Sequence, residues 1–499
     1  MKTLNYETLK QSNYEGYLLE DAPVRVLQFG EGNFMRGFVD YFIDQMNEKA
    51  GFNTKVTLVQ PIGQGAFRLK DIINEQEGLY TLYLQGFQDG QEVREKRVIS
   101  AVKNCLNAYE DWNEVLDMAK NPDLRFITCN TTEAGIAYDP TCRFEDVPAA
   151  SYPAKLTQFL FARFQQQLPG FIILACELID NNGKELEKCV LQHAKDWNLG
   201  EDFIQWIQNE NVFCSTLVDR IVTGYPRAEA DAMNTENGYV DNTLDTGEIF
   251  GVWVIEGPQS LRDELPFEKA GLPIIVTDDH KPYKERKVRI LNGAHTSMVL
   301  GAFLAGQTIV RDCMYDPTIS AYMNEAIYNE IIPTLSLSKE DCEQFAKAVT
   351  ERFKNPFIDH ELLAISLNST AKWKARVLPS LLGYVDKFHK LPKALTTSLA
   401  SYIAFYRGKE LDADGLKAVN PVTKQPYTIK DDADVLEFFA ANSDKPNAQL
   451  VSLVLGNTSF WGQDLNAIEG LHDAVTSALD TIDNEGAMAA MQACLNKGE

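Results

Sequence analysis

The stretch VRVLQFGEGNFMRGFVDYFIDQMNE, residues 24–48, predicts a strand, a glycine turn and a helix in direct succession. VRVLQF (Val24–Phe29) is an apolar run of strand length, and the apolar residues after the turn recur at helical spacing. Gly30 and Gly32 lie in the turn, and Gly37 follows them. At such a turn, backbone N–H groups can approach a pyrophosphate at the start of a helix. The spacing G-x-G-x4-G differs from the usual G-x-G-x2-G, so an ordinary turn remains the alternative.

Further strand patterns follow this unit and alternate with helical ones. KVTLVQ (Lys55–Gln60), LRFITCN (residues 124–130) and FIILACE (residues 171–177) have the length and composition of buried strands. Alternating strands and helices predict an α/β domain with a mainly parallel sheet that is covered by helices. An inserted hairpin is expected within residues 79–102, with Asp89 and Gly90 at its turn.

The second half of the chain has a different pattern. After PIIVTDD (residues 273–279), long helical patterns predominate, and the polar stretch around residues 409–433 predicts an exposed loop. We therefore expect two domains. Residues 1–280 form a dinucleotide-binding α/β domain with the inserted hairpin, and residues 281–499 form an α-helical substrate domain. Ligand sites are common at domain junctions, which directs attention to the helix that begins near residue 281.

The composition excludes several classes of partner. Acidic residues outnumber basic ones, 71 to 47, and the formal net charge is −24. Nucleic acids and anionic membranes are therefore not expected as partners, since both normally bind basic surfaces. No apolar stretch is long enough to cross a bilayer, and the polar N-terminus is unlike a signal peptide. Nine cysteines without a CxxC pair suit reduced thiols, so we expect a soluble protein located in the cytoplasm.

A second turn with glycine, CNTTEAG (residues 129–135), closes the strand that begins near residue 124. The ends of such strands face the cofactor crevice, so Asn130, Thr131, Thr132 and Glu133 are candidates to bond the ribose or the nicotinamide. A helix cap and turn is the alternative for this composition. The strand at residues 55–60 ends in glutamine and proline instead of an acidic residue, which leaves NAD and NADP undistinguished at that position.

The stretch KPYKERKVRILNGAHTSMVLGAFLAG, residues 281–306, begins as the most basic run of the chain and continues as an apolar helix. On a regular helix Lys284, Lys287, Asn292 and His295 share a face about 140° wide. A proton donor and an amide beside each other suit the reduction of a carbonyl group. An exposed lysine, a bonded asparagine and a core histidine are the alternative. The extra cations can attract an anion that the rest of the protein repels.

Four motifs together resemble the mannitol dehydrogenase family of polyol-specific long-chain dehydrogenases: GEGNFMRGF, NTTEAG, FCSTLVDRIVTGYP (residues 213–226) and KERKVRILNGAHT. The resemblance extends over nearly the whole chain. It implies a Rossmann-type N-terminal domain, a helical C-terminal domain and metal-independent NAD(H) chemistry in the cleft between them. It further implies that Lys287 is the general acid/base, that Asn292 polarises the carbonyl oxygen and that His295 holds a substrate hydroxyl. The cofactor-binding candidates at the first motif are Phe29, directly before it, and Gly30, Gly32, Asn33 and Phe34 within it.

The chain departs from the wider family in the stretch ACELIDNNG, residues 175–183. The family usually has S-C-D-N-x3-N-G here, so Leu178 replaces the first asparagine and Asn182 becomes the candidate for the second donor to the substrate oxygen. The segment that follows Val218-Asp219-Arg220 also departs from the family pattern, and we count Asp219 among the substrate-binding candidates. Both departures resemble the uronate-specific branch of the family.

A hexuronate carries a carboxylate, for which a guanidinium or ammonium group is the natural partner. The candidates are Lys284, Arg289, Lys372 and Arg376. Lys372 is preferred because it matches a lysine in a family motif near the substrate, whereas Arg289 lies about 200° from Lys287 on a regular helix. An ordinary solvated helix face is the alternative for this set.

Three functions remain open from the sequence. The first is an NAD-dependent reductase of a small sugar acid of the hexuronate class. The second is a related enzyme for another stereoisomer, or for an uncharged ketose and its polyol. The third is a nucleotide-binding sensor without activity, which the presence of Lys287, Asn292 and His295 argues against. We expect a monomer or a weak homo-oligomer with no metal.

Overall fold

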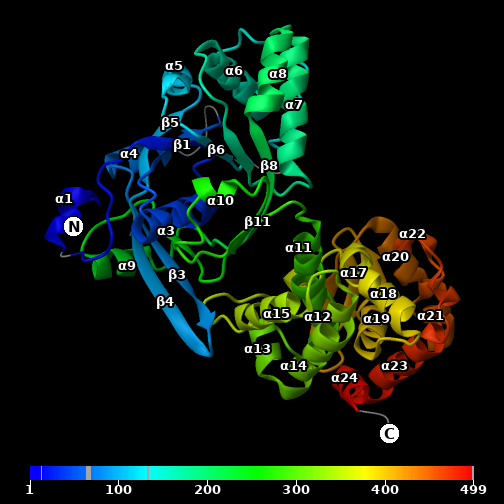
Figure 1. The fold of residues 1–499 in the computed structure, drawn as a ribbon. Helices are drawn as coiled ribbons and strands as arrows, with labels where there is room; N and C mark the ends of the chain where they lie inside the picture. The colour runs from blue at the N-terminus through cyan, green and yellow to red at the C-terminus, as the bar shows by residue number, and fades with distance from the viewer. Residues whose placement is uncertain (13, 63–68, 132–133, 497–499) are drawn as a thin grey trace. The chain divides into compact units, whose positions relative to one another are not determined.

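The computed structural model describes residues 1–12, 14–62, 69–131 and 134–496 (Figure 1). The chain forms two compact units. The N-terminal unit comprises Met1–Gln85 and Val93–His280, and the C-terminal unit comprises Gly86–Glu92 and Lys281–Glu499. The tip of the predicted hairpin thus groups with the C-terminal unit.

An eight-stranded sheet forms the centre of the N-terminal unit, in the order β11-β10-β8-β7-β6-β1-β2-β5. Its strands are β1 (Val24–Phe29), β2 (Lys55–Gln60), β5 (Val102–Asn107), β6 (Phe126–Cys129), β7 (Ile172–Ala175), β8 (Val212–Asp219), β10 (Val252–Glu256) and β11 (Ile274–Thr277). All neighbours are parallel except β8 and β10. The order reverses between β1 and β6, which is the switch point of a Rossmann-type fold. The predicted α/β class is confirmed, and β1 and β2 have the predicted bounds.

Side chains of the central strands alternate between two apolar cores, one on each face of the sheet. Val26 joins the core that contains Phe38 and Phe42, whereas Leu27 and Phe29 join the other. Burial on both faces explains why these strands are apolar runs instead of alternating ones. The α- and π-helices of the unit are α1 (Tyr6–Gln11), α2 (Asn33–Met35), η1 (Arg36–Asp40), α3 (Tyr41–Ala50), α4 (Leu69–Glu75), α5 (Trp112–Asp117), α6 (Tyr152–Gln165), α7 (Asn182–Asp196), α8 (Glu201–Glu210), α9 (Ala230–Asn237) and α10 (Leu261–Glu264). Figure 1 shows α6, α7 and α8 stacked together beside the sheet.

The predicted hairpin is formed by β3 (Tyr80–Gln88) and β4 (Gln91–Ile99), with β9 (Asp245–Glu248) parallel to β3. Asp89 (φ 50°) and Gly90 (φ 80°) are both left-handed at the turn, as a two-residue hairpin turn of the primed type requires. Within the C-terminal unit, the side chain of Lys347 reaches Asp89 at 3.1 Å.

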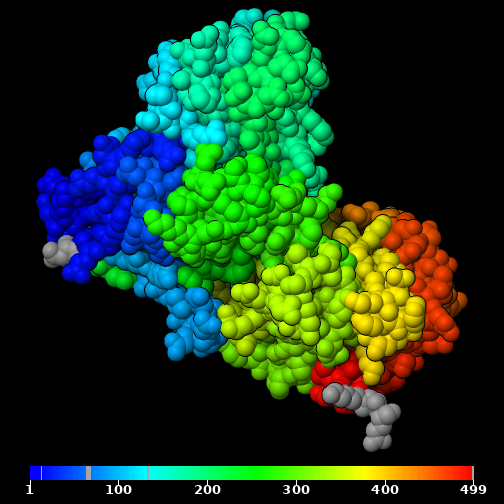
Figure 2. All heavy atoms as spheres, viewed as in Figure 1, coloured from blue at the N-terminus to red at the C-terminus, as the bar shows by residue number. Residues whose placement is uncertain are grey.

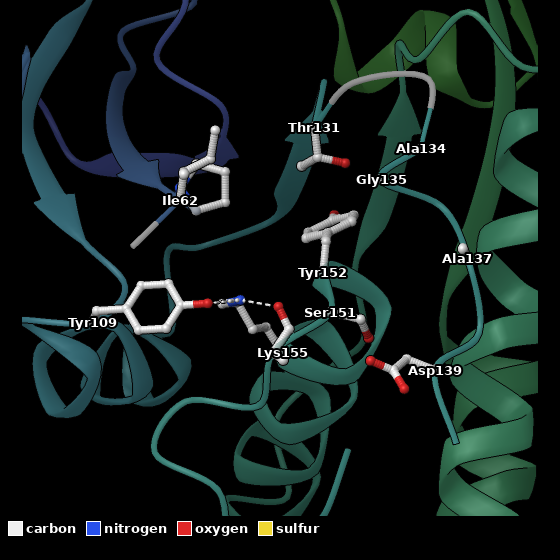
Figure 3. A pocket seen from close by; sticks show the side chains of 12 residues that line it. Ile62, Tyr109, Thr131, Ala134, Gly135, Ala137, Asp139, Ser151, Tyr152 and Lys155 are labelled. Atoms are coloured by element: carbon white, nitrogen blue, oxygen red, sulfur yellow. Dashed lines mark hydrogen bonds between the residues drawn. The ribbon is translucent and has the colours of Figure 1, made fainter. Parts of the chain in front are cut away.

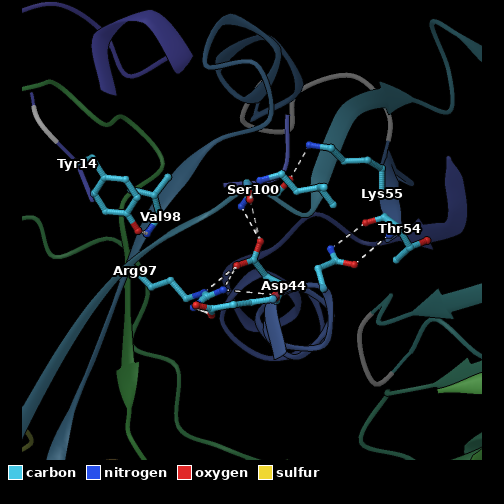
Figure 4. Close-up of polar contacts among 10 residues, drawn as sticks. Tyr14, Asp44, Thr54, Lys55, Arg97, Val98 and Ser100 are labelled. Carbon is cyan, nitrogen blue, oxygen red and sulfur yellow. Dashed lines mark hydrogen bonds and ion pairs between the residues drawn. The ribbon is translucent and has the colours of Figure 1, made fainter. Parts of the chain in front are cut away.

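A buried carboxylate, Asp44 on α3, fastens β4 to the helix (Figure 4). One oxygen accepts hydrogen bonds from the backbone and hydroxyl of Ser100 (2.9 and 3.1 Å), and the other pairs with Arg97 (2.6 Å). Lys55 on β2 donates to the carbonyl oxygen of Ser100 at 2.6 Å. The network holds the base of the hairpin against the central sheet, and removing one partner would leave the other buried charge uncompensated.

The C-terminal unit is mainly helical, as predicted. Its α- and π-helices are α11 (Lys281–Arg286), η3 (Lys287–Asn292), α12 (Gly293–Leu304), α13 (Val310–Tyr315), α14 (Pro317–Asn324), η4 (Glu325–Ile331), α15 (Lys339–Phe353), α16 (Leu362–Ile365), α17 (Ser369–Arg376), α18 (Leu378–Phe388), α19 (Lys393–Phe405), α20 (Ala433–Asn442), α21 (Asn447–Leu455), α22 (Thr458–Trp461), α23 (Leu471–Glu485) and α24 (Ala487–Leu495). Early and late helices of the unit meet, because α24 packs against α12 and α14. In Figure 2, red atoms of the C-terminal end lie beside yellow-green atoms from the early part of the unit.

The prediction of an exposed loop around residues 409–433 was wrong. This segment folds as an antiparallel sheet of β12 (Glu410–Asp412), β13 (Gly415–Val419) and β14 (Pro426–Ile429). Leu416, Tyr427 and Ile429 are buried, and the Tyr427 hydroxyl donates to the carbonyl oxygen of Phe405 at 2.7 Å. Each of these short strands has too few buried apolar residues to show the period of two that predicts a strand.

The nine cysteines are all free thiols, and seven of them are buried. Burial raises the pKa of several of these thiols, that of Cys214 to about 12, which disfavours the reactive thiolate. Within the described part of the chain, no helix has the length and apolar character that a membrane span needs.

Candidate functional site

The first glycine turn locks the carboxyl ends of β1 and β6 together. Gly30 has φ +117°, and a Cβ atom there would lie 2.6 Å from the carbonyl oxygen of Asn130. The Gly30 N–H donates to the carbonyl oxygen of Val59, and the Asn130 N–H donates to that of Phe29. Only glycine satisfies this combination of backbone angle and close approach. The turn therefore lies at the switch point of the sheet.

Gly32 differs from Gly30 because neither packing nor backbone angle requires a glycine there. Its φ is −64° and its ψ is 165°, which any residue adopts, and a Cβ atom would meet no protein atom within 4 Å. It is the N-cap of the continuous helix formed by α2, η1 and α3. The first N–H groups of a helix have no partner within it. A bare backbone facing open space at a helix start suits the approach of a pyrophosphate.

The other candidates of this turn have mixed roles. The side chain of Phe29 lies in the core beside Tyr152, with 5.2 Å between ring centroids, so the expectation that it contacts a cofactor does not fit this geometry. Phe34 stacks on Phe38 at 5.1 Å. Asn33 accepts a hydrogen bond from the buried Arg36, which also donates to two backbone carbonyl oxygens and so holds the turn in place.

A cavity of about 400 Å³ opens beside the ends of β2, β5 and β6 (Figure 3). Its lining residues are Pro61, Ile62, Tyr109, Thr131, Ala134, Gly135, Ala137, Asp139, Ala150, Ser151, Tyr152 and Lys155. Lys155 Nζ donates to the carbonyl oxygen of Ala150 (2.7 Å) and to the Tyr109 hydroxyl (3.2 Å). Burial lowers the pKa of Lys155 to about 8. Of the residues that line this cavity, the sequence analysis named only Thr131. Others could have been suspected because they follow the carboxyl ends of predicted strands, where ligands of such sheets bind.

The turn after β6 is held by hydrogen bonds to Glu177, which follows β7. The backbone N–H and the hydroxyl of Thr131 both donate to Oε1 of Glu177, each at 3.0 Å. Burial raises the pKa of Glu177. Asn130 is half-buried, and Thr132 and Glu133 lie outside the described residues. Glu177 thus positions a turn that contributes Thr131 to the cavity wall.

In the C-terminal unit, the predicted regular helix contains a π-helical turn, η3, between α11 and α12. The Gly293 N–H donates to the carbonyl oxygen of Val288, five residues earlier. Bonds of this type place residues five apart, such as Lys287 and Asn292, about one turn from each other, and π turns occur frequently at functional sites. The face shared by Lys287 and Asn292 is therefore narrower than a regular helix would give, and both side chains are half-buried.

His295 follows one turn later, on α12. Its ring stacks on Phe353 with a centroid distance of 4.0 Å, and its buried Nε2 has no hydrogen-bond partner among the described residues. Burial, together with the charges of His360, Arg352 and Arg376, lowers the pKa of His295 to about 3. The imidazole is thus neutral under ordinary conditions. A neutral ring with an unused nitrogen suits a hydrogen bond to a ligand hydroxyl.

The candidate cations occupy different environments. Lys372 Nζ donates to the carbonyl oxygen of Ile365 at 2.8 Å. Arg289 pairs with Glu285 at 3.0 Å and contacts Ser380. Lys284 lies on α11 and is half-buried. Arg376, at the end of α17, is half-buried and makes no hydrogen bond or ion pair with any described residue, and burial lowers its pKa.

Two substrate-site candidates of the N-terminal unit, Asn182 and Asp219, are buried within the protein. Both amide hydrogens of Asn182 are used, by the carbonyl oxygens of Glu177 (2.9 Å) and Thr216 (3.1 Å), so the expected donation to a substrate oxygen does not fit this geometry. Asp219 ends β8 and is buried. The neighbouring Arg220 donates to the carbonyl oxygens of Gly37, Ile249 and Phe250 and lies over aromatic rings, which makes it a packing residue.

One group among the described residues has the composition of a metal site: Glu256, Asp279 and His280 present ligand atoms within 4.8 Å of one another. Glu256 already pairs with the ammonium of Lys184 (2.5 Å) and with His280 (2.6 Å). These partners lower the pKa of Glu256 to about 2. The negative charge of Glu256 is therefore already balanced by protein groups.

Comparison with known proteins identifies the family. The mannitol dehydrogenase Rossmann domain matches residues 24–269, and the mannitol dehydrogenase C-terminal domain matches residues 279–483. The chain belongs to the mannitol dehydrogenase family. The resemblance inferred from the four motifs is thereby confirmed.

Individual members of the family are similar over their full length. The altronate oxidoreductases of Enterobacter sp. (strain 638) and Klebsiella pneumoniae (strain 342) are each 45% identical, over 97% and 99% of this chain and 99% of their own. That of Escherichia coli O7:K1 is 44% identical over 99% of both chains. Among solved structures, a D-sorbitol dehydrogenase has a TM-score of 0.79 at 21% identity, over 98% of this chain and all of its own. Pseudomonas fluorescens mannitol 2-dehydrogenase, solved with NAD and D-mannitol, has 0.63 at 22%, over all of both chains. These two structures confirm the fold.

Proposed function

We propose that the protein catalyses the reversible, NAD(H)-dependent interconversion of D-tagaturonate and D-altronate, without a metal. The observation that carries this proposal is the π turn that places Lys287 and Asn292 one turn apart, with the unpartnered nitrogen of His295 following. The likeness to altronate oxidoreductases over the full length supports the choice of sugar acid.

The chain's own residues supply what the reduction of a ketone needs besides a hydride, which NADH supplies when it is bound. Lys287 gives a proton to the ketone oxygen as that oxygen becomes an alkoxide, and takes it back in the reverse direction. The amide of Asn292 donates a hydrogen bond to the same oxygen, a contact of a kind worth about 3 kcal/mol in the transition state. The neutral His295 holds a neighbouring hydroxyl. Ketone, NADH and one proton thus give alcohol and NAD⁺.

We assign the nucleotide to the N-terminal unit on two observations. The open backbone at Gly32 suits a pyrophosphate, and the cavity of about 400 Å³ has room for part of a nucleotide. Among the lining residues that the structure describes, Lys155 is the one cation, and it is already bonded to Ala150 and Tyr109. A 2′-phosphate would need free cations, so we propose NAD over NADP. Higher affinity for NADPH than for NADH would refute this choice.

The decisive experiment follows NADH consumption with D-tagaturonate, D-fructuronate and D-fructose side by side. The proposal expects the highest kcat/KM for tagaturonate. A preference for fructuronate would assign the other hexuronate stereoisomer, and a preference for fructose would assign an uncharged ketose and its polyol. Binding of NADH without turnover of any of the three would support the remaining alternative, a sensor.

Two further properties belong to this proposal. Nine free thiols and the use of NAD(H) favour a cytoplasmic location. We keep a monomer or weak homo-oligomer as the expected state, which light scattering over a range of protein concentrations would test.

A further inference from the structure

We propose that the guanidinium of Arg376 binds the carboxylate of the substrate and so determines the preference for a hexuronate over an uncharged ketose. This inference rests on the proposed function and names the specificity residue of the same site. It replaces Lys372, which the sequence favoured.

The first argument is the state of Arg376 itself. The side chain is half-buried and makes no hydrogen bond or ion pair with any described residue. Its pKa is lowered by burial, with no acidic group acting in the opposite direction. A partly desolvated guanidinium that lacks a partner costs free energy. A carboxylate that accepts two parallel N–H hydrogen bonds is the ligand that best offsets this cost.

The second argument is the position of Arg376. Its carbonyl oxygen lies 3.0 Å from the place of a Cβ atom on Gly293, the residue that directly follows Asn292. Its charge is also close enough to lower the pKa of His295. The end of α17 therefore lies against the part of the chain where η3 passes into α12. A ligand bonded to Asn292 and His295 is thus within the neighbourhood of this guanidinium.

The third argument is the state of two competing cations, Lys372 and Arg289. Lys372 is bonded to the carbonyl oxygen of Ile365 and lies near the negative charge of Asp431. Arg289 has Glu285 as its partner. Asp359, whose charge acts on the neighbouring His360, pairs with Arg311 at 2.8 Å.

Asp431 is likewise engaged, because one of its oxygens accepts hydrogen bonds from Thr370 and from the Tyr406 hydroxyl. No charge partner for Arg376 therefore comes from the described residues of the unit. The positive charge of Arg352, which also acts on His295, adds to a field that favours an anion at this place.

The test compares Arg376→Met with Lys374→Met, a matched variant of an exposed cation on the same helix. For each variant, kcat/KM is measured with tagaturonate and with an uncharged ketose such as tagatose or fructose. We expect Arg376→Met to lower kcat/KM for tagaturonate at least 100-fold, mainly through KM, and to change that for the ketose less than threefold. Lys374→Met should leave both values near those of the wild type. Inhibition by altronate should weaken in parallel with the loss for tagaturonate, while inhibition by an uncharged polyol should not.

A second variant and a rescue separate charge recognition from structure. Arg376→Lys should keep part of the preference for the uronate, and added guanidinium should restore tagaturonate turnover in Arg376→Ala. Equal losses for both substrates, or an unchanged preference, would overturn the role of Arg376. If Arg376→Met does not fold, Arg376→Lys decides, with about a tenfold rise in KM for the uronate alone expected from the lost bidentate geometry. Failure of the wild type to reduce tagaturonate would instead overturn the proposed function.

Discussion

The carbonyl oxygen of Arg376 lies 3.0 Å from the position that a Cβ atom would take on Gly293. This is tighter than ordinary van der Waals contact, so a methyl group on Gly293 would require α17 to move by a few tenths of an ångström. The contact fixes the end of α17 relative to the turn that carries Lys287 and Asn292. A small residue thereby sets the distance between the proposed reacting groups and the proposed carboxylate partner.

Gly293→Ala should accordingly disturb the site more than the fold. Alanine favours a helix over glycine by about 1 kcal/mol, which partly offsets the crowding at Arg376. We expect a several-fold loss in kcat/KM for tagaturonate, a small change in Tm and unchanged affinity for NADH. Steady-state kinetics and a nucleotide titration of the same preparation would check this. Wild-type kinetics would show that the contact has no role in the site.

Lys287→Ala should lower kcat about 10²-fold or more, because the proton donor to the ketone oxygen is lost. Affinity for NADH should not change, since the groups assigned to the nucleotide lie in the other unit. Turnover is to be measured from pH 6 to 9, with Lys281→Ala as a control on the same helix. Near-wild-type turnover across this range would exclude Lys287 as the general acid.

The two glycines of the first turn should respond in opposite ways to alanine. At Gly30 the φ of +117° and the contact with Asn130 forbid a Cβ atom, so Gly30→Ala should destabilise the fold by about 2 kcal/mol or more. At Gly32 a Cβ atom meets no protein atom, so Gly32→Ala should leave Tm unchanged but weaken NADH binding about tenfold. Calorimetry and fluorescence titration of both variants would test the pair. Unaltered NADH affinity in Gly32→Ala would argue against a pyrophosphate there.

Asp40 should make the stability of the fold depend on pH. Burial raises its pKa from 3.8 to about 7, with Gln28 as a hydrogen-bond partner for only one of its oxygens. Because the folded value lies above the unfolded one, its contribution is fully present below pH 4 and is lost as the pH rises to 7. The loss is at most about 4 kcal/mol.

Asp40→Asn should therefore gain stability relative to the wild type at pH 8 compared with pH 5. Tm measured at both values is the readout, and Asp123→Asn, at an exposed position, is the control. A difference between Asp40→Asn and the wild type that does not vary with pH would contradict this assignment.

Local patterns were sufficient for the strands that are buried on both faces. Val24–Phe29 and Lys55–Gln60 were predicted to the residue, because each is a short apolar run that ends at glycine or proline. The small sheet of β12, β13 and β14 was missed, because its strands are stabilised by a few buried residues, such as Leu416 and Tyr427, whose partners come from elsewhere in the unit.

At the candidate site, too, features set by neighbouring residues were predicted, and those set by residues far apart in the sequence were not. The roles of Lys287, Asn292 and His295 were predicted from their spacing within one helix and from the family resemblance, and they stay predictions. The π turn was not foreseen, because the segment was read at the regular helical period and a π turn is a single-turn insertion within an otherwise regular helix. The hydrogen bonds of Asn182 were not foreseen, because one of them goes to the carbonyl oxygen of Thr216, 34 residues away in the sequence.

The sequence by itself determined the strand–glycine–helix unit and the helical second half, and it brought three candidate reacting groups onto one helix, because each depends on residues within a few turns of one another. Only the tertiary structure shows which of three candidate cations already have partners. Arg376, Lys372 and Arg289 have the same charge, and their neighbours distinguish them. The carbonyl oxygen of Ile365 and the carboxylate of Glu285 engage two of them, while Arg376 is brought against Gly293 without a partner of its own.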